Sequence, residues 1–216
     1  MFQRWRRFLE KVFEPTLRLL PEGLRWRQTQ SAYIQWSRDK LPPEYMAYLV
    51  ERGQMFAEFV GEPGPLVDVG CGNGLIGGVP YVKTGYSPIR RGCYPILGID
   101  PLPLEAPIPW ITRFKQMRCE DYAELGYRAA TFVTSFDHLR DPAVCLTRLR
   151  LYGVKKLYLW ETLWRVPPGG DWHHAHRYTY VELRKLLNEM GYRIVRAVKV
   201  DENTGSGGWF IEAEEA

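Results

Sequence analysis

The stretch of the chain that decides the fold is Leu66-Val67-Asp68-Val69-Gly70-Cys71-Gly72-Asn73-Gly74. A short apolar run with an acid in it is followed by three glycines at alternate positions. This order predicts a buried strand that leads directly into a tight turn, whose backbone a ligand can approach because glycine has no side chain. The motif makes a nucleotide-like cofactor the first hypothesis.

Length and charge limit the functions to consider. A chain of 216 residues with 45% hydrophobic residues fits one globular domain with an appendage. The net charge of +4 is uneven, since residues 1–40 hold seven Arg and two Lys against three Glu and one Asp. The remaining residues are nearly neutral, which argues against a broad nucleic-acid-binding face on the core.

The cysteines and the apolar runs bear on the cellular setting. Cys71, Cys93, Cys119 and Cys145 are far apart and form no CxxC pair, so we expect neither a zinc site nor a disulfide framework. A reducing, cytoplasmic location is the simpler interpretation. No apolar run approaches the roughly 20 residues that span a bilayer, and no secretory signal is apparent.

The N-terminal region has a different character from the remainder. Residues 2–13 place aromatic and aliphatic residues on one helical stripe with most Arg and Lys residues off it. Two interpretations remain open: a helix that covers the core, or a peripheral membrane or protein contact through residues 1–40. A second helix is expected between Pro42-Pro43 and Gly61. We therefore divide the chain into a helical arm or cap, 1–62, and a cofactor-binding domain, 63–216.

Strands and helices alternate through the second part of the chain. A helix is predicted from Asp141-Pro142 to Gly153, and another after the capping-box pair Thr179 and Glu182. Strands are predicted at 65–69, 95–99, around 117–119, 129–134, 156–160, 192–200 and 209–213. This alternation predicts an α/β fold: a Rossmann-like open, mostly parallel sheet with an antiparallel C-terminal edge strand and helices on both faces.

Acidic or small polar residues stand at four successive strand ends: Asp68, Asp100, Glu120-Asp121 and Ser135-Phe136-Asp137. Ligands bind at such ends in open α/β sheets. A carboxylate such as Asp100 accepts hydrogen bonds from both hydroxyls of a ribose. An acid after the third strand suits an adenine amine, and a carboxylate after the first strand suits an ammonium group, directly or through water. Ribose, adenine and ammonium together describe S-adenosylmethionine.

From about Leu66 to the C-terminus the chain resembles the class I S-adenosylmethionine-dependent methyltransferases, most closely the small-molecule branch often called type 11. The similarity lies in the glycine motif, Gly98-Ile99-Asp100, Cys119-Glu120-Asp121, Ser135–Pro142 and His174–Thr179. The resemblance implies S-adenosylmethionine as cofactor, S-adenosylhomocysteine as product and no metal. The implied cofactor-binding residues are Asp68, Gly70, Cys71, Gly72, Gly74, Asp100, Pro101, Glu120, Asp121, Ser135 and Phe136.

The chain departs from the family pattern after the glycine motif. Glycines and prolines crowd residues 75–95, so a full-length helix is not expected there. We interpret this segment as an irregular insertion that either forms part of the substrate site or weakens cofactor binding.

The expected activity is transfer of the sulfonium methyl to an oxygen, nitrogen or carbon nucleophile of a small molecule by in-line displacement. His138 and His174 are the candidate bases, since neutral imidazole suits that task near neutral pH. Glu161 is a further candidate for a base or a substrate ligand. The alternatives are an RNA methyltransferase that uses the basic arm, and a degenerate, non-catalytic partner subunit with the methyltransferase fold.

Overall fold

The computed structural model describes residues 43–61, 64–71, 96–103, 111–164, 176–201 and 206–216. The predicted helix at 2–13, the insertion at 75–95, Gly72, Gly74 and His174 lie outside these residues. The division of the chain at residue 62 and the contacts proposed for residues 1–40 stay predictions.

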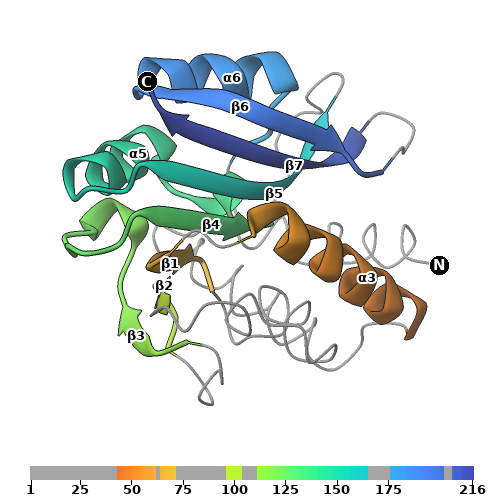
Figure 1. Ribbon diagram of the computed structural model, residues 1–216, viewed down its shortest axis with the longest axis horizontal. Coiled ribbons are helices and arrows are strands. Elements are labelled where there is room, and N and C mark those ends of the chain that lie inside the picture. The colour runs from red at the N-terminus through yellow and green to blue at the C-terminus, as the bar shows by residue number, and fades with distance from the viewer. Residues whose placement is uncertain (1–42, 62–63, 72–95, 104–110, 165–175, 202–205) are drawn as a thin grey trace, which may run out of the picture.

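A sheet of seven strands forms the centre of the described structure, in the order β3-β2-β1-β4-β5-β7-β6 (Figure 1). The strands are β1 (Leu66–Val69), β2 (Ile96–Asp100), β3 (Arg113–Gln116), β4 (Ala129–Val133), β5 (Lys156–Trp164), β6 (Tyr192–Lys199) and β7 (Ser206–Glu215). The first five strands pair in parallel, and β7 is antiparallel to both β5 and β6. The predicted fold class is confirmed, with the last strand placed one position in from the edge.

In the described part of the chain, three α-helices and two short 3₁₀ turns surround the sheet: α3 (Pro43–Val60), α5 (Pro142–Leu151), α6 (Tyr180–Glu189), η2 (Cys119–Asp121) and η3 (Phe136–His138). The side chain of Asp141 accepts from the Val144 amide and caps α5, while Thr179 and Glu182 form the predicted capping box of α6. Helix α3 ends at Val60, and the next residue, Gly61, has a φ of +66°.

The helices cover both faces of the sheet. Side chains of α5 and α6 share one apolar core with residues such as Val67, Leu97 and Phe132. On the opposite face Phe56 of α3 packs against Trp160 and Phe210, with ring centroids 6.0 and 5.1 Å away. Because successive strand residues point to opposite faces, each central strand is buried on both sides. Figure 1 shows α3 in front of the sheet.

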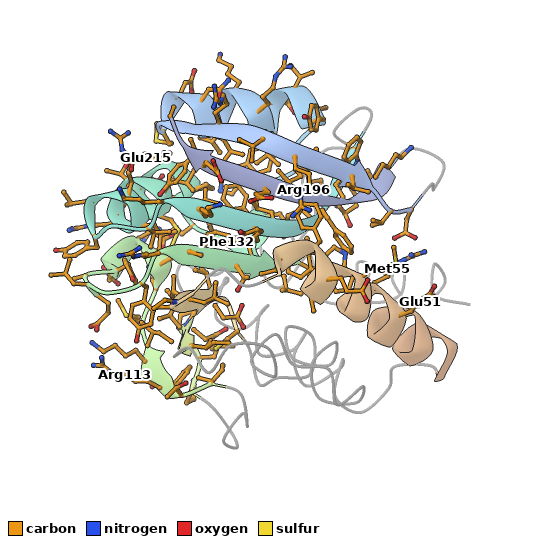
Figure 2. All side chains as sticks on the ribbon, viewed as in Figure 1. Glu51, Met55, Arg113, Phe132, Arg196 and Glu215 are labelled. Carbon is orange, nitrogen blue, oxygen red and sulfur yellow. A yellow bond between two sulfur atoms is a disulfide. The ribbon has the colours of Figure 1, made fainter. Side chains whose placement is uncertain are left out.

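The third strand and the fifth strand differ in extent from the predictions. The third strand lies at Arg113–Gln116, and the predicted region around 117–119 instead leads into η2. This strand has no apolar run to reveal it, because it is a partly exposed edge strand in which only Phe114 is apolar; Figure 2 labels Arg113 at this edge. Strand β5 continues past residue 160 to Trp164, since β7 pairs with it along its whole length.

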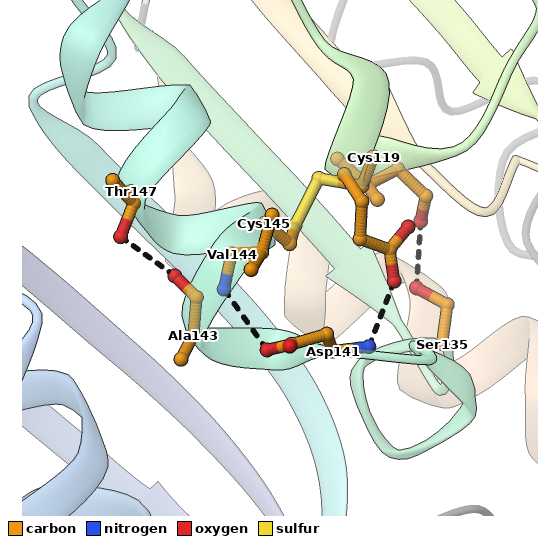
Figure 3. The surroundings of a disulfide bond; sticks show 9 residues. Cys119, Ser135, Asp141, Ala143, Val144, Cys145 and Thr147 are labelled. Carbon is orange, nitrogen blue, oxygen red and sulfur yellow. Dashed lines mark hydrogen bonds between the residues drawn. A yellow bond between two sulfur atoms is a disulfide. The ribbon is translucent and has the colours of Figure 1, made fainter.

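The expectation that the cysteines form no disulfide is wrong. Cys119 at the start of η2 and Cys145 on α5 form a disulfide, although 26 positions separate them in the sequence (Figure 3). The spacing of the two cysteines in the sequence does not predict this disulfide, because they become neighbours only when the fold places η2 beside α5. The disulfide also removes the observation on which a reducing compartment was predicted, and the cytoplasmic location stays a prediction.

Candidate functional site

The carboxyl ends of β2, β1, β4 and β5 lie at one edge of the sheet, because these neighbouring strands run parallel. At this edge the Gly70 amide donates to the Ile99 carbonyl over 2.8 Å. Gly70 has a φ of +68°, and a Cβ added to it would come within 2.7 Å of the Ser135 Cβ. The first glycine of the motif is therefore required both by its backbone conformation and by the close approach of the turn after β4.

Asp68, the acid of the motif, points to the face of the sheet that α3 covers, and it is only 5% exposed. Its Oδ1 accepts a hydrogen bond from the Thr131 hydroxyl over 2.8 Å. Burial raises the pKa of Asp68 to about 7; the Thr131 hydrogen bond opposes this shift and the charge of Asp100 adds to it. No Lys, Arg or His among the described residues forms an ion pair with Asp68. The sequence gives no sign of Thr131 as its partner, since only the strand register brings the two together.

Asp100 ends β2 and is buried at the carboxyl end of that strand, which is where ligands bind in open α/β sheets. Its Oδ1 accepts from the Leu102 amide over 2.8 Å, an arrangement that orients the carboxylate in its own turn. The carbonyl of the next residue, Pro101, accepts from the Gln116 side chain over 3.2 Å. The structure thus fixes the Asp100-Pro101 turn beside the glycine turn.

Cys71 is buried, and its thiol stays protonated because burial, followed by the charges of Asp68 and Asp100, raises its pKa. A Cβ on Gly98 would lie 2.9 Å from the Cys71 sulfur, so the neighbouring strand has a glycine where this side chain packs. The geometry favours packing, and not nucleophilic chemistry, as the task of this thiol.

The two predicted acids of η2 are in different situations. Glu120 Oε1 accepts from the Asp141 amide over 2.9 Å and so connects η2 to the N-terminus of α5. Asp121 is exposed at the end of η2. Cys119, the residue before Glu120, links η2 to α5 through its disulfide with Cys145 (Figure 3). Of the two acids, Asp121 is therefore the one that is accessible to a ligand.

The turn after β4 carries Ser135 and Phe136. Both backbone amides donate to Oε1 of Glu161, over 3.0 and 2.8 Å. The Ser135 hydroxyl donates to the Val69 carbonyl over 2.6 Å. All three donors hydrogen-bond within the protein. Any contact of Ser135 or Phe136 with a cofactor would therefore use their other atoms.

His138 closes the same turn. Its side chain is 14% exposed, and its Nε2 lies 3.6 Å from Oδ1 of Asp137. The Asp137 carbonyl accepts from the His176 amide over 3.0 Å, which brings the segment before α6 to this turn. His138 is thus placed at the same sheet edge as Asp68 and Asp100, and Asp137 is a neighbour that our list of site residues omits.

The described part of the chain holds neither a metal-binding cluster nor a membrane-spanning helix. No three His, Cys, Asp or Glu side chains in it are grouped so as to hold a metal ion, and the metal-free expectation stays a prediction. No helix in it is long and apolar enough to cross a membrane.

Known structures share this architecture. The Burkholderia thailandensis 1,6-didemethyltoxoflavin-N1-methyltransferase, with bound 1,6-didemethyltoxoflavin and S-adenosylhomocysteine, has a TM-score of 0.63 and 14% identity over 91% of each chain. The Synechocystis magnesium protoporphyrin IX methyltransferase with bound S-adenosylmethionine has a TM-score of 0.54 and 14% identity over 90% of this chain and 92% of that one. The chain has the class I methyltransferase fold. No protein-family model matches it, and no curated protein matches it in sequence.

The same fold also includes enzymes named for other reactions. The [4+2]-cyclase SpnF has a TM-score of 0.59 and 15% identity over 77% of this chain and 80% of that one. The shared fold therefore does not by itself identify the reaction, which depends on the site residues of this chain.

Proposed function

We propose that the chain transfers a methyl group from S-adenosylmethionine to a small-molecule acceptor. The observation that carries this proposal is the pair of buried acids, Asp68 and Asp100, on neighbouring strands beside the positive-φ turn at Gly70. Carboxylates suit an ammonium group and a pair of ribose hydroxyls, and the glycine turn admits a ligand close to the backbone. Two structures with the same fold hold S-adenosylmethionine or its demethylated product.

The residues divide by the part of the cofactor that their chemistry fits. Asp100 and Pro101 would hold the ribose, Asp68 the ammonium group, and Asp121 the adenine amine, with Glu120 fixing the segment around it. Gly70, Cys71, Ser135 and Phe136 would line the same site, and Gly72 and Gly74 stay predictions. The bound cofactor would supply an electrophilic methyl group on a sulfonium.

His138 would serve as the base when the acceptor is a hydroxyl. Asp137, 3.6 Å away, favours the protonated imidazole that forms when His138 accepts a proton. His174 stays a prediction for the same task.

Calorimetric titration with S-adenosylhomocysteine tests the cofactor assignment. We expect binding by the wild-type protein and a loss of affinity of about tenfold or more in Asp100→Asn, because charge-assisted hydrogen bonds are removed. Glu214→Gln is the matched control and should bind normally, because Glu214 pairs with Lys156 at the opposite end of β5 from the site. Absence of binding by the wild-type protein would overturn the proposal.

A second candidate is a reaction other than methyl transfer, since SpnF shares the fold. Incubation with methyl-labelled cofactor and a fractionated cell extract separates the possibilities. Label in the small-molecule fraction supports the proposal, and label in RNA supports the RNA methyltransferase alternative. Binding of S-adenosylhomocysteine with no label in any fraction favours the second candidate or a non-catalytic subunit.

A further inference from the structure

The turn after β4 has a backbone conformation that its own sequence disfavours. Thr134 has a φ of +50°, a region that β-branched residues rarely adopt. Such strain persists only where surrounding contacts over-determine it, and it is common at functional sites. The Thr134 amide donates to the Trp160 carbonyl over 2.7 Å, so β5 holds the start of the turn.

The next two amides are held by one atom. Ser135 and Phe136 both donate to Oε1 of Glu161, a β5 side chain that is 3% exposed. Two amide donors on one buried oxygen fix the direction of both peptide groups. Glu161 therefore completes, from the neighbouring strand, the support that the Thr134 conformation requires.

The surroundings of Glu161 favour its neutral form. Burial raises the pKa of Glu161 well above its ordinary value; the charge of Asp137 raises it further, while the two amide hydrogen bonds oppose the shift. Two further titratable groups are described at this place: Tyr178, which interacts electrostatically with both acids, and His138 beside Asp137. A protonated carboxyl keeps a carbonyl oxygen that still accepts both amides.

The turn touches both parts of the site. On one side Ser135 donates to the Val69 carbonyl and lies against Gly70, where the glycine motif begins. On the other side it carries Asp137 and His138, and the Asp137 carbonyl accepts from the His176 amide. A displacement of this turn would thus move the proposed cofactor contacts and the proposed base together.

We propose that Glu161 is the positioning residue of this site: by accepting both amides it holds the Thr134–Leu139 turn, and through that turn it sets the places of Gly70 and His138. The consequence for methyl transfer rests on the proposed function, whereas the hold on the turn does not.

Amide NMR spectra of the full chain test the hold on the turn. In the wild-type protein we expect the Ser135 and Phe136 amide shifts to titrate together, with a midpoint above the ordinary glutamate value of 4.5. Glu161→Gln keeps an accepting oxygen, so both amides should keep their shifts near those of the protonated wild type and lose the titration. Asp137→Asn identifies any part of the titration that belongs to Asp137. Ser135 and Phe136 amides that ignore both pH and Glu161→Gln would overturn the proposal.

Binding of S-adenosylhomocysteine tests the consequence. We expect Glu161→Gln to bind within about threefold of wild type and Glu161→Ala to lose about tenfold or more, because a pair of buried amides loses its acceptor. Thr162→Ala, an exposed change at the next position of β5, should bind normally. Normal binding by Glu161→Ala would overturn the positioning role. If Glu161→Ala does not fold, Glu161→Gln serves as the test. Loss of S-adenosylhomocysteine binding by Glu161→Gln at a pH above the wild-type titration midpoint would then overturn the positioning role.

The two proposals fail in different ways. A wild-type protein that shows the amide titration but binds no S-adenosylhomocysteine contradicts the proposed function alone. A protein that binds S-adenosylhomocysteine, with Ser135 and Phe136 amides indifferent to Glu161, contradicts only the inference about Glu161.

Discussion

The β6–β7 ribbon and the carboxyl-end edge of the sheet differ in how their acidic side chains are paired. In the β6–β7 ribbon Glu212 pairs with Arg196 over 2.9 Å and Glu214 pairs with Lys156 over 2.6 Å, at partly exposed positions. At the carboxyl-end edge Asp68 is buried and accepts only from a hydroxyl among the described residues, and Glu161 only from backbone amides. The ribbon carboxylates are thus neutralised by cations, whereas Asp68 and Glu161 form no ion pair among the described residues.

This difference affects protonation. Lys156 has a raised pKa, caused first by its hydrogen bond to Glu214, so this ammonium group stays charged. Asp68 has a pKa of about 7 because burial disfavours its charge and no described cation compensates. We infer that the ribbon uses charge for structure, while the strand-end edge keeps acidic groups for a ligand.

The largest expected effect comes from the covalent bond near the strand-end edge. Reduction of the Cys119–Cys145 disulfide should lower the free energy of unfolding by about 3 to 4 kcal/mol, because the two cysteines are 26 positions apart in the sequence and the bond restricts the unfolded chain. Urea unfolding with and without a reductant measures this. The double variant Cys119→Ala/Cys145→Ala should not respond to the reductant. An unchanged midpoint in the reduced wild-type protein would contradict the prediction.

The next prediction concerns how much the charged form of Asp68 lowers the stability of the fold. The folded-state pKa of about 7 exceeds the ordinary value of 3.8, so the folded state binds the proton more tightly. Stability should therefore fall as the pH rises from about 4 to about 7. Asp68→Asn should lack this part of the slope and be more stable than wild type at about pH 8. Equal slopes in urea unfolding at several pH values would refute this.

A smaller effect is expected in the ribbon. Arg196 pairs with Glu212, donates to the Phe59 carbonyl and lies 3.8 Å from the centre of the Phe59 ring. Arg196→Ala should lower the free energy of unfolding by about 1 to 2 kcal/mol through the lost packing and pairing on α3. Arg196→Lys should recover little, because Lys lacks the planar fork. Arg193→Ala, an exposed change on the same strand, serves as the control, and an equal loss there would contradict the assignment.

The smallest effect concerns a pair on an exposed helix surface. Lys185 and Glu189 of α6 are 3.8 Å apart, with most of the Lys185 side chain exposed. Lys185→Ala should change the free energy of unfolding by less than about 0.5 kcal/mol, and added salt should remove even that. A change as large as that of Arg196→Ala would show that exposure does not separate the two kinds of charge pair.

Local signals account for what the sequence predicts well. The capping box of Thr179 and Glu182, the cap at Asp141 and the glycine turn at Gly70 depend on residues within a few positions of one another, and each has its predicted conformation. The charged edge strand at Arg113–Gln116 was misplaced because it lacks the apolar pattern of a buried strand.

The remaining features depend on residues that are distant in the sequence. Asp68 and Thr131 are 63 positions apart, and parallel register alone makes them neighbours. Glu161 was recognised as a candidate, but its hold on Ser135 and Phe136 follows from the pairing of β4 with β5. The disulfide was missed for the same reason, since no local pattern brings η2 beside α5.

Among the described residues no cation pairs with Asp68, and we infer that the ammonium group of the proposed cofactor supplies one. Calorimetric titration with S-adenosylhomocysteine at about pH 7, in two buffers with different ionisation enthalpies, measures the protons exchanged on binding. The wild-type protein should release about half a proton, since an Asp68 that is half protonated becomes charged beside the ammonium group. Asp68→Asn should bind more weakly and lack this release. Binding without any proton release, or with the same release in Asp68→Asn, would contradict the claim.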